Sequence, residues 1–296
     1  VKKVCMADGG EGTAEALVSS LCGEWVDVEV LDPLMRPIHA RYGVVDDGRT
    51  AVIEMASASG LTLLAEDERN PLKTSTYGTG ELIKDALEKG CTRFIVGIGG
   101  SATNDAGTGM LQALGFRFLD ASGKELGQGG DILEKVLHIC SQDGHEMLKN
   151  AHFIVACDVN NPFHGLNGAA HIFARQKGAN DSMIEELDKG MRSFANVIHQ
   201  TTGKDISHVP GSGAAGGMGS CRHVCAHPLP GHAGESGLQR QRGHPARRGR
   251  QPLDAALPVY LLRGEHRAGS ALRGVFPHGC DRRCHRHSGC DAHLLD

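Results

Sequence analysis

The sequence predicts an α/β protein with a largely parallel sheet, because short β-rich runs alternate with segments of helical pattern along most of its 296 residues. Its composition is that of a globular protein, with 40% hydrophobic and 22% charged residues. Aromatic residues make up only 4% and Gly contributes 41 residues, so we expect many tight turns and close backbone approaches.

Each predicted element follows from its local pattern. The run WVDVEVL at 25–31 alternates apolar and polar residues and predicts a strand, as does AVIEM at 51–55. A helix is expected from an N-cap at Thr79 to a stop at Gly90, and a long amphipathic helix at 182–201. The other predicted elements are a helix at 14–21, strands at 94–98, 116–119 and 153–157, and a short helix beginning at 110–114.

The charge and hydropathy of the sequence argue against nucleic acid and membranes as binding partners. The net charge of -4 is the sum of an acidic body at residues 1–219 and a basic tail, and an acidic body argues against nucleic acid as a partner. The sequence has neither a signal-peptide pattern nor an apolar run that would span a membrane. We therefore expect a cytoplasmic protein that binds no membrane, with its scattered cysteines as buried free thiols.

The character of the sequence changes at about residue 220. Residues 220–296 are rich in Arg, His, Pro, Gly and Cys and contain no Lys, Ile, Asn, Thr or Met. Because parallel strands need β-branched residues, this tail is expected to form no proper domain and is interpreted as frameshifted or disordered. A genuine low-complexity tail is the alternative. The Cys and His residues at 280–290 have zinc-ligand chemistry but lack a second pair at a standard distance, so their spacing is interpreted as accidental.

A first Gly-rich polar cluster, ADGGEGT at 7–13, leads into the predicted helix at 14–21. Glycines at a helix entry let backbone N–H groups point at an anion. Asp8 and Glu11 are candidates for holding a cation or the hydroxyl groups of a substrate. An acidic turn that stabilises the helix dipole is the alternative interpretation.

A second cluster, FIVGIGGSATNDAGTG at 94–109, places a polar loop directly after a buried strand. Ligands of open α/β sheets bind at this carboxyl edge. Ser101, Thr103, Asn104 and Asp105 can exchange hydrogen bonds with phosphate and hydroxyl groups. No Gly-Lys-Ser/Thr follows, so the loop is not a Walker A motif.

The same loop leaves open a protein of another class, a nicotinamide-dinucleotide-binding domain. Gly97, Gly99 and Ala102 have the spacing of the dinucleotide fingerprint, and Asp120 ends the next predicted strand where a ribose would be bound. That fingerprint requires a helix to begin at once, whereas two further glycines keep this segment irregular.

Two more clusters follow. ACDVNNP at 156–162 ends a predicted strand and places Asp158 and Asn161 at its carboxyl end, with Lys177 beyond it as a candidate point charge for a phosphate. A turn carboxylate and a surface lysine are the alternative interpretation. PGSGAAGGMG at 210–219 has small residues at nearly every position, which suits close approach of backbone to a nucleotide or to another helix.

Taken together, the clusters resemble the glycerate kinase family of the bacterial glycerate 2-kinase type. The motifs that carry the resemblance occur in the family's order over residues 1–219. They are MADGGEGT (6–13), AVIEMASASGL (51–61), NPLKTSTYGTGELI (70–83), GIGGSATNDAGTGMLQALG (97–115), ACDVNNPFHGLNGAA (156–170), QKGA (176–179) and PGSGAAGGMG (210–219).

The resemblance implies two α/β domains within residues 1–219, with an internal boundary near 60–80 and the active site in the cleft between them. It implies ATP with Mg²⁺ as phosphoryl donor and D-glycerate as acceptor, and a site that works mostly by positioning and charge stabilisation. The implied ATP and phosphate contacts are Gly99, Gly100, Ser101, Thr103, Asn104, Lys177, Gly216 and Gly217. The implied substrate contacts are Asp8, Glu11, Asp105 and Asn161. Asp8 and Asp158 are the candidate catalytic and Mg²⁺-binding residues.

Three departures from the family's pattern add an alternative function. The sequence lacks the APDSFK-like opening, lacks the TGEG and Gly-Lys-x-Pro segments after Gly219, and has Arg175 where the family usually has Pro. The alternative is therefore a non-catalytic fragment or pseudo-enzyme of that family.

Overall fold

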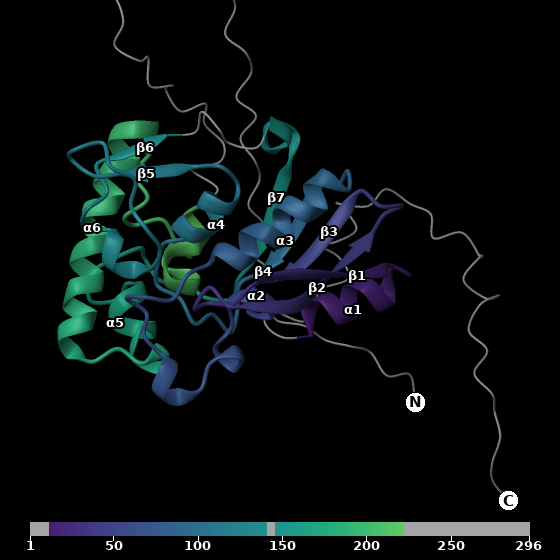
Figure 1. Ribbon diagram of the computed structural model, residues 1–296, viewed down its shortest axis with the longest axis horizontal. Helices are drawn as coiled ribbons and strands as arrows, with labels where there is room; N and C mark the ends of the chain where they lie inside the picture. The colour runs from purple at the N-terminus through teal and green to yellow at the C-terminus, as the bar shows by residue number, and fades with distance from the viewer. Residues whose placement is uncertain (1–11, 141–145, 222–296) are drawn as a thin grey trace, which may run out of the picture.

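The computed structural model describes residues 12–140 and 146–221, which build a five-stranded sheet with helices on both faces (Figure 1). The strand order is β1-β2-β3-β4-β7. The strands are β1 (Glu24–Leu31), β2 (Pro37–Val45), β3 (Thr50–Glu54), β4 (Arg93–Gly97) and β7 (His152–Ala156).

The α/β class is confirmed, with a parallel core and an antiparallel edge. Strands β3, β4 and β7 run parallel, so that Ile95 of β4 lies between Val52 and Ile154. Strands β1 and β2 form an antiparallel hairpin that joins β3 through β2. The three parallel strands end at Glu54, Gly97 and Ala156, and the loops that follow them therefore leave the sheet at the same edge.

The period-two alternation of the strands distributes their side chains between two helical layers. Val52 and Ile95 pack on one face beneath α1 (Thr13–Ser20). Ile53 and Val96 point to the other face, where α3 (Tyr77–Glu88) covers them. Burying each such side chain stabilises the fold by roughly 1.5–3 kcal/mol, so the two apolar faces of β3 and β4 fix both helices.

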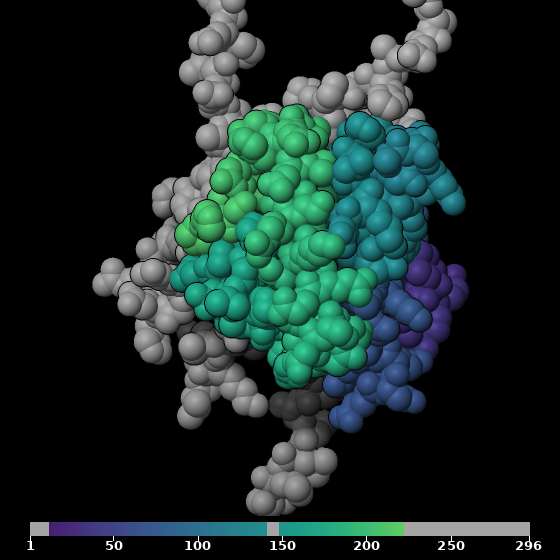
Figure 2. All heavy atoms as spheres, turned by 90° about the vertical axis from the view of Figure 1, so that its left-hand side faces the viewer, coloured from purple at the N-terminus to yellow at the C-terminus, as the bar shows by residue number. Residues whose placement is uncertain are grey.

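Apart from α2, which lies against α3 and β2, the remaining helices and the second, two-stranded sheet lie beside this sheet, on the left in Figure 1. The longest is α6 (Asp181–Thr202), which begins where Asn180 Oδ1 accepts a hydrogen bond from Met183 N and ends at Gly203 in the left-handed conformation. Figure 2 shows the face formed by this part of the molecule, with the green C-terminal segments beside the teal segment around the β5–β6 hairpin. The other helices are α2 (Ala56–Ser59), α4 (Thr108–Ala113) and α5 (Ala169–Phe173), and the hairpin strands are β5 (Arg117–Leu119) and β6 (His138–Cys140).

Single 3₁₀ turns connect several of these elements. Two of them bear on the site described below, η5 (Arg175–Lys177) and η6 (Ala214–Ser220). The others are Leu61–Leu63, Glu66–Glu68, Gly130–Ile132 and Glu146–Asn150.

All the predicted helices and strands are present, with ends within two or three residues of those predicted, but three details were wrong or missing. Thr79 is not an N-cap, because α3 already begins at Tyr77 and the Thr79 hydroxyl is buried against the Ser59 hydroxyl at 2.7 Å. Strands β2 and β6 were not predicted. The strand at Arg117–Leu119 is not the next strand of the main sheet, since it pairs with β6 in a separate two-stranded sheet.

Several expectations concern residues beyond the described ranges. Asp8, Glu11 and almost all of the tail at 220–296, including its Cys and His residues, lie outside the described residues. Strands that precede and strands that follow residues 60–80 in the sequence belong to the same main sheet. The predicted domain boundary near 60–80 stays a prediction. None of the helices in the described part of the chain combines the length and the apolar character needed to cross a membrane.

The contact between α3 and α4 depends on the absence of a side chain at Gly80. A Cβ at this position would lie 2.4 Å from Met110 O and 2.7 Å from Ala113 Cβ. We expect Gly80→Ala to lower the free energy of unfolding by about 1–3 kcal/mol, since one helix must shift. Urea unfolding followed by circular dichroism measures this. The matched control is Gly127→Ala, whose Cβ meets nothing within 4 Å. Equal stability of the two variants would contradict the packing described for α3 and α4.

Candidate functional site

A pocket of about 310 Å³ lies at the carboxyl edge of the parallel strands. One wall is formed by the loops that follow β4 and β7, and the other by the end of α5, by η5 and by η6. Its volume is at the lower end of the range for small-molecule sites. The lining residues are Leu61, Ile98, Gly99, Gly100, Ser101, Ala156, Cys157, Asp158, Val159, Phe173, Gln176, Lys177, Ala214 and Ala215.

The loop after β4 is held by backbone hydrogen bonds to the segment that follows β3. Leu61 N donates to Gly100 O at 2.9 Å, and Ala102 N donates to Ser59 O at 2.9 Å. Gly100 adopts a left-handed φ of 72°, and a Cβ there would lie 3.2 Å from Ala56 Cβ. The loop therefore passes close to α2 and presents the backbone of residues 99–101 to the pocket.

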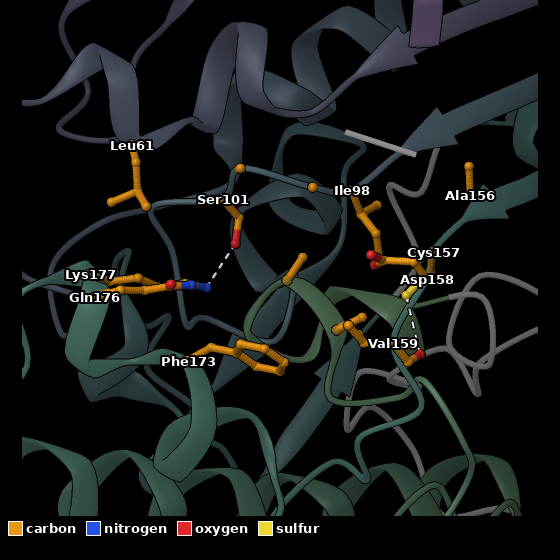
Figure 3. Close-up of a pocket in the computed structure, with 14 residues that line it drawn as sticks. Leu61, Ile98, Ser101, Ala156, Cys157, Asp158, Val159, Phe173, Gln176 and Lys177 are labelled. Atoms are coloured by element: carbon orange, nitrogen blue, oxygen red, sulfur yellow. Dashed lines mark hydrogen bonds between the residues drawn. The ribbon is translucent and has the colours of Figure 1, made fainter. Parts of the chain in front are cut away.

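Lys177 is the buried charged group of this pocket, with only 2% of its surface exposed. Its Nζ donates to Ser101 Oγ at 2.7 Å and to Thr103 O at 2.6 Å (Figure 3). Both acceptors are uncharged. Burial lowers the pKa of Lys177 to about 7, although the negative charge of Asp105 acts in the opposite direction.

Asp105 fixes the turn that carries these acceptors. Its carboxylate accepts hydrogen bonds from Thr76 N and Thr76 Oγ1 at 2.8 Å, and from Gly107 N and Gly109 N at 3.0 and 3.3 Å. Thr76 Oγ1 also accepts a hydrogen bond from Met110 N at 2.9 Å, which ties this turn to α4. Burial nevertheless raises the pKa of Asp105 above its ordinary value.

The small residues of η6 pack against the same turn. Ala215, Gly216 and Gly217 all have positive φ, and Ala106 N donates to Gly216 O at 3.0 Å. A Cβ on Gly216 would lie 2.2 Å from Thr103 O. Because Thr103 O also accepts from Lys177, any bulk at Gly216 would disturb the acceptor of the buried amine.

Asp158 stands across the pocket from Lys177. Figure 3 shows its carboxylate beside Ile98 and Cys157, while Lys177 and Gln176 lie together on the other side with the amine directed at Ser101. Asp158 is exposed and comes two residues after the end of β7. The pocket therefore offers an acidic group at one side and a buried basic group at the other.

The structure brings together Gly99, Gly100, Ser101, Asp158 and Lys177 from the residues predicted as a site. The other predicted residues in the described ranges are not among the residues that line the pocket. Thr103 joins it only through its carbonyl. Asn104 is buried, donating to Met191 Sδ at 3.2 Å, and Asn161 Nδ2 donates to Asn167 O at 2.9 Å.

The turn that carries the acceptors of Lys177 is supported by Asp105, Gly216 and Gly217, none of which lines the pocket. Their predicted contacts with substrate or phosphate stay predictions. Thr103 Oγ1 and Asn104 Oδ1 are buried and have no hydrogen-bond partner among the described residues.

Nine lining residues were not among the predicted site residues, and four of them add distinct chemistry to the pocket. Phe173 and Leu61 supply apolar surface, Gln176 supplies an amide next to Lys177, and Cys157 supplies a buried thiol. Burial raises the pKa of Cys157 above its ordinary value, so this thiol is not activated. Gln176 lies in the QKGA motif (176–179) next to Lys177, but it was not singled out as a site residue. A helix end such as Phe173 carries no comparable signal.

The alternative of a nicotinamide-dinucleotide site is not supported by this geometry. Asp120 follows β5, which belongs to the separate two-stranded sheet, and its carboxylate accepts from Ser122 Oγ at 2.7 Å within its own turn. Helix α4 begins only at Thr108, well after the Gly-rich turn. The fingerprint spacing thus occurs without the strand and helix arrangement that gives it meaning.

Comparison with known proteins gives one family. Residues 1–230 match the glycerate kinase family. The chain is 50% identical over 217 residues to the glycerate kinase of Haemophilus influenzae and 50% identical over 217 residues to the glycerate 2-kinase of Escherichia coli, covering 73% of this chain in each case. It spans 57% of the length of each of these two relatives.

A solved structure shows the same fold. The crystal structure of a protein assigned as glycerate kinase 2 from Salmonella typhimurium LT2 superposes with a TM-score of 0.72 at 48% sequence identity. The superposition covers 74% of this chain and 59% of that one.

The titration of Lys177 makes stability depend on pH. The unfolded chain binds a proton at this amine up to its ordinary pKa of 10.5, but the folded protein loses it near 7. Between these values the unfolded state holds more protons, so the contribution of Lys177 to folding becomes more favourable as pH rises. We expect wild type to gain stability relative to Lys177→Met by about 1.4 kcal/mol per pH unit between pH 7 and 10.

Urea unfolding of wild type and Lys177→Met at several pH values measures this difference. Lys204→Met, at an exposed position, is the matched control and should give a constant offset from wild type. A constant offset for Lys177→Met as well would contradict the burial of an uncompensated amine.

Proposed function

The chain belongs to the glycerate kinase family, and from this premise we propose that it transfers the γ-phosphoryl group of ATP to a hydroxyl group of D-glycerate. The observation that carries the proposal is the pairing of a Gly-rich loop and a buried lysine on one side of the pocket with an exposed carboxylate on the other. Since the chain spans 57% of these relatives, the activity of the whole enzyme is part of the proposal.

The phosphate groups fit the side of the pocket formed by residues 99–101 and Lys177. Backbone N–H groups of a Gly-rich loop can approach phosphate closely, and the Ser101 hydroxyl is free to donate because Lys177 already donates to its oxygen. The Lys177 ammonium adds a positive charge where charge builds up on the transferred group. The 310 Å³ of the pocket accommodates a three-carbon acid together with a phosphoryl group rather than a complete nucleotide.

Asp158 is the group placed to act on the acceptor. In the proposed step a hydroxyl oxygen of D-glycerate attacks the γ-phosphorus, the bond to the β–γ bridging oxygen breaks, and ADP leaves. The hydroxyl proton passes to the Asp158 carboxylate, which also orients the attacking oxygen. Its exposure and position after β7 allow the acceptor to reach it from solvent.

Magnesium enters as part of the nucleotide substrate. No group of three His, Cys, Asp or Glu side chains in the described ranges has the geometry of a metal site. Mg²⁺ on a nucleotide needs only one or two carboxylates beside the phosphate oxygens, and Asp158 has the chemistry of such a ligand. When bound, Mg²⁺ would neutralise charge on the β- and γ-phosphates.

We also place the protein in the cytoplasm. All five cysteines in the described ranges are free thiols, four of them buried, which fits a reducing compartment. Small molecules are its proposed ligands, since the pocket is concave and small.

Ser101 and Asp158 give the sharpest activity test, in an assay of ADP release that depends on D-glycerate. Asp158→Asn should lower kcat by about 10²–10⁴-fold, because the acceptor hydroxyl loses its base. Ser101→Ala should mainly raise KM for ATP. The control Asp67→Asn changes an exposed carboxylate that does not line the pocket, and it should leave kcat and KM unchanged.

The same assay separates the alternatives. Turnover by wild type that is unchanged in Asp158→Asn would remove Asp158 from the mechanism. Binding of ATP or D-glycerate without turnover would favour the non-catalytic fragment, and binding of neither would contradict the proposed function.

A further inference from the structure

The buried amine of Lys177 has a property that a phosphate-binding lysine does not require. Most such lysines are solvated ammonium ions whose charge is permanent at neutral pH. Here the side chain is only 2% exposed, and its two hydrogen bonds go to the uncharged oxygens Ser101 Oγ and Thr103 O. A buried charge without a close counter-ion is costly, and proteins avoid the cost by neutralising the group.

The hydrogen bonds fit the neutral amine. A neutral amine has two N–H donors and one lone pair, and the two donors match the two acceptors. The lone pair then occupies the remaining direction on a nitrogen that lines the pocket. Protonation turns that lone pair into a third N–H donor, which needs a new acceptor.

Other charged groups around Lys177 are already engaged or distant. The negative charge of the buried Asp105 carboxylate acts on Lys177. Four hydrogen bonds nevertheless hold that carboxylate within its own turn. Arg175, on η5 itself, pairs with Asp181. Arg69 approaches η5 through its backbone at Gly178, and Cys157 and Asp158 line the pocket elsewhere. Within the described ranges, none of these is hydrogen-bonded to the amine.

We propose that Lys177 takes up one proton from solvent as an anionic substrate group enters the pocket, so that anion binding at this site is coupled to protonation of the amine. This inference rests on the proposed function, because it concerns the phosphate side of that pocket. The bound anion supplies the missing counter-charge and accepts the third N–H. Above pH 7 the amine is thus mostly uncharged in the empty pocket and becomes cationic when the anion binds.

The coupling predicts how affinity depends on pH. The free amine has a pKa of about 7, so it is charged at pH 6 and must gain a proton at pH 8. An anion of constant charge should therefore bind roughly tenfold more weakly at pH 8 than at pH 6. Sulfate suits this test, because its charge does not change over that range.

The direct test is NMR of the full 296-residue chain carrying lysine labelled with ¹³C at Cε, with the Lys177 signal assigned from Lys177→Arg. We expect Lys177 to titrate near neutrality in the free protein and at least one pH unit higher with saturating sulfate or ATP. Lys204, at an exposed position, is the internal control, and its signal should be the same with and without sulfate or ATP.

Two outcomes would overturn the proposal. One is a Lys177 signal that titrates above pH 9 in the free protein. The other is a Lys177 titration that does not move although ATP binds and is turned over, which would leave the proposed kinase activity intact. Failure of ATP and D-glycerate to bind or react, while sulfate still shifts Lys177, would contradict the proposed function and leave the proton coupling standing.

Discussion

The hydrogen bonds of one buried amine join the two walls of the pocket. Lys177, on η5, reaches Ser101 Oγ and Thr103 O on the loop after β4, and only 2% of its surface is exposed. This link requires that the turn behind it be rigid, which Asp105 ensures through its four hydrogen bonds. It also requires that η6 lie directly against Thr103, which only a residue without a Cβ allows at position 216. The Gly-rich segments are thus explained by packing around a single buried polar contact as much as by ligand binding.

The sheet determines where that contact forms. Parallel pairing of β3, β4 and β7 brings three loops to one edge, and the pocket takes residues from each of them. Helices α1 and α3 fix the sheet from both faces, and the loops that follow its parallel strands form the pocket. An acidic group on one side and a neutral, protonatable amine on the other then suit a reaction in which a hydroxyl loses a proton and negative charge develops on a phosphoryl group.

Much of this could be predicted from the sequence, because the strong patterns are local. The buried strands at 94–98 and 153–157 and the residues that follow them located four residues of the pocket wall, and the QKGA segment located Lys177. Strand β2 was missed because it contains Gly43 and begins at Pro37, which weaken a strand pattern. Gly43 is needed because a Cβ at this position would lie 2.0 Å from Val18 Cγ2 of α1. A contact of this kind between distant segments cannot be recognised from the local sequence. Asn104 and Asp105 have the residue types of a ligand site, and the hydrogen bonds that they make within the protein could not be read from the sequence.

The central claim is that the pocket between residues 99–101 and Lys177 receives the phosphate groups of ATP. Backbone-amide NMR of the chain during titration with Mg²⁺ and ATP tests it most directly, since every amide of the pocket wall is its own reporter. The account predicts saturable shifts concentrated at Gly99, Gly100, Ser101 and Lys177, with little change in the β1–β2 hairpin on the far side of the sheet. Saturable shifts that spare this loop and appear elsewhere would contradict it.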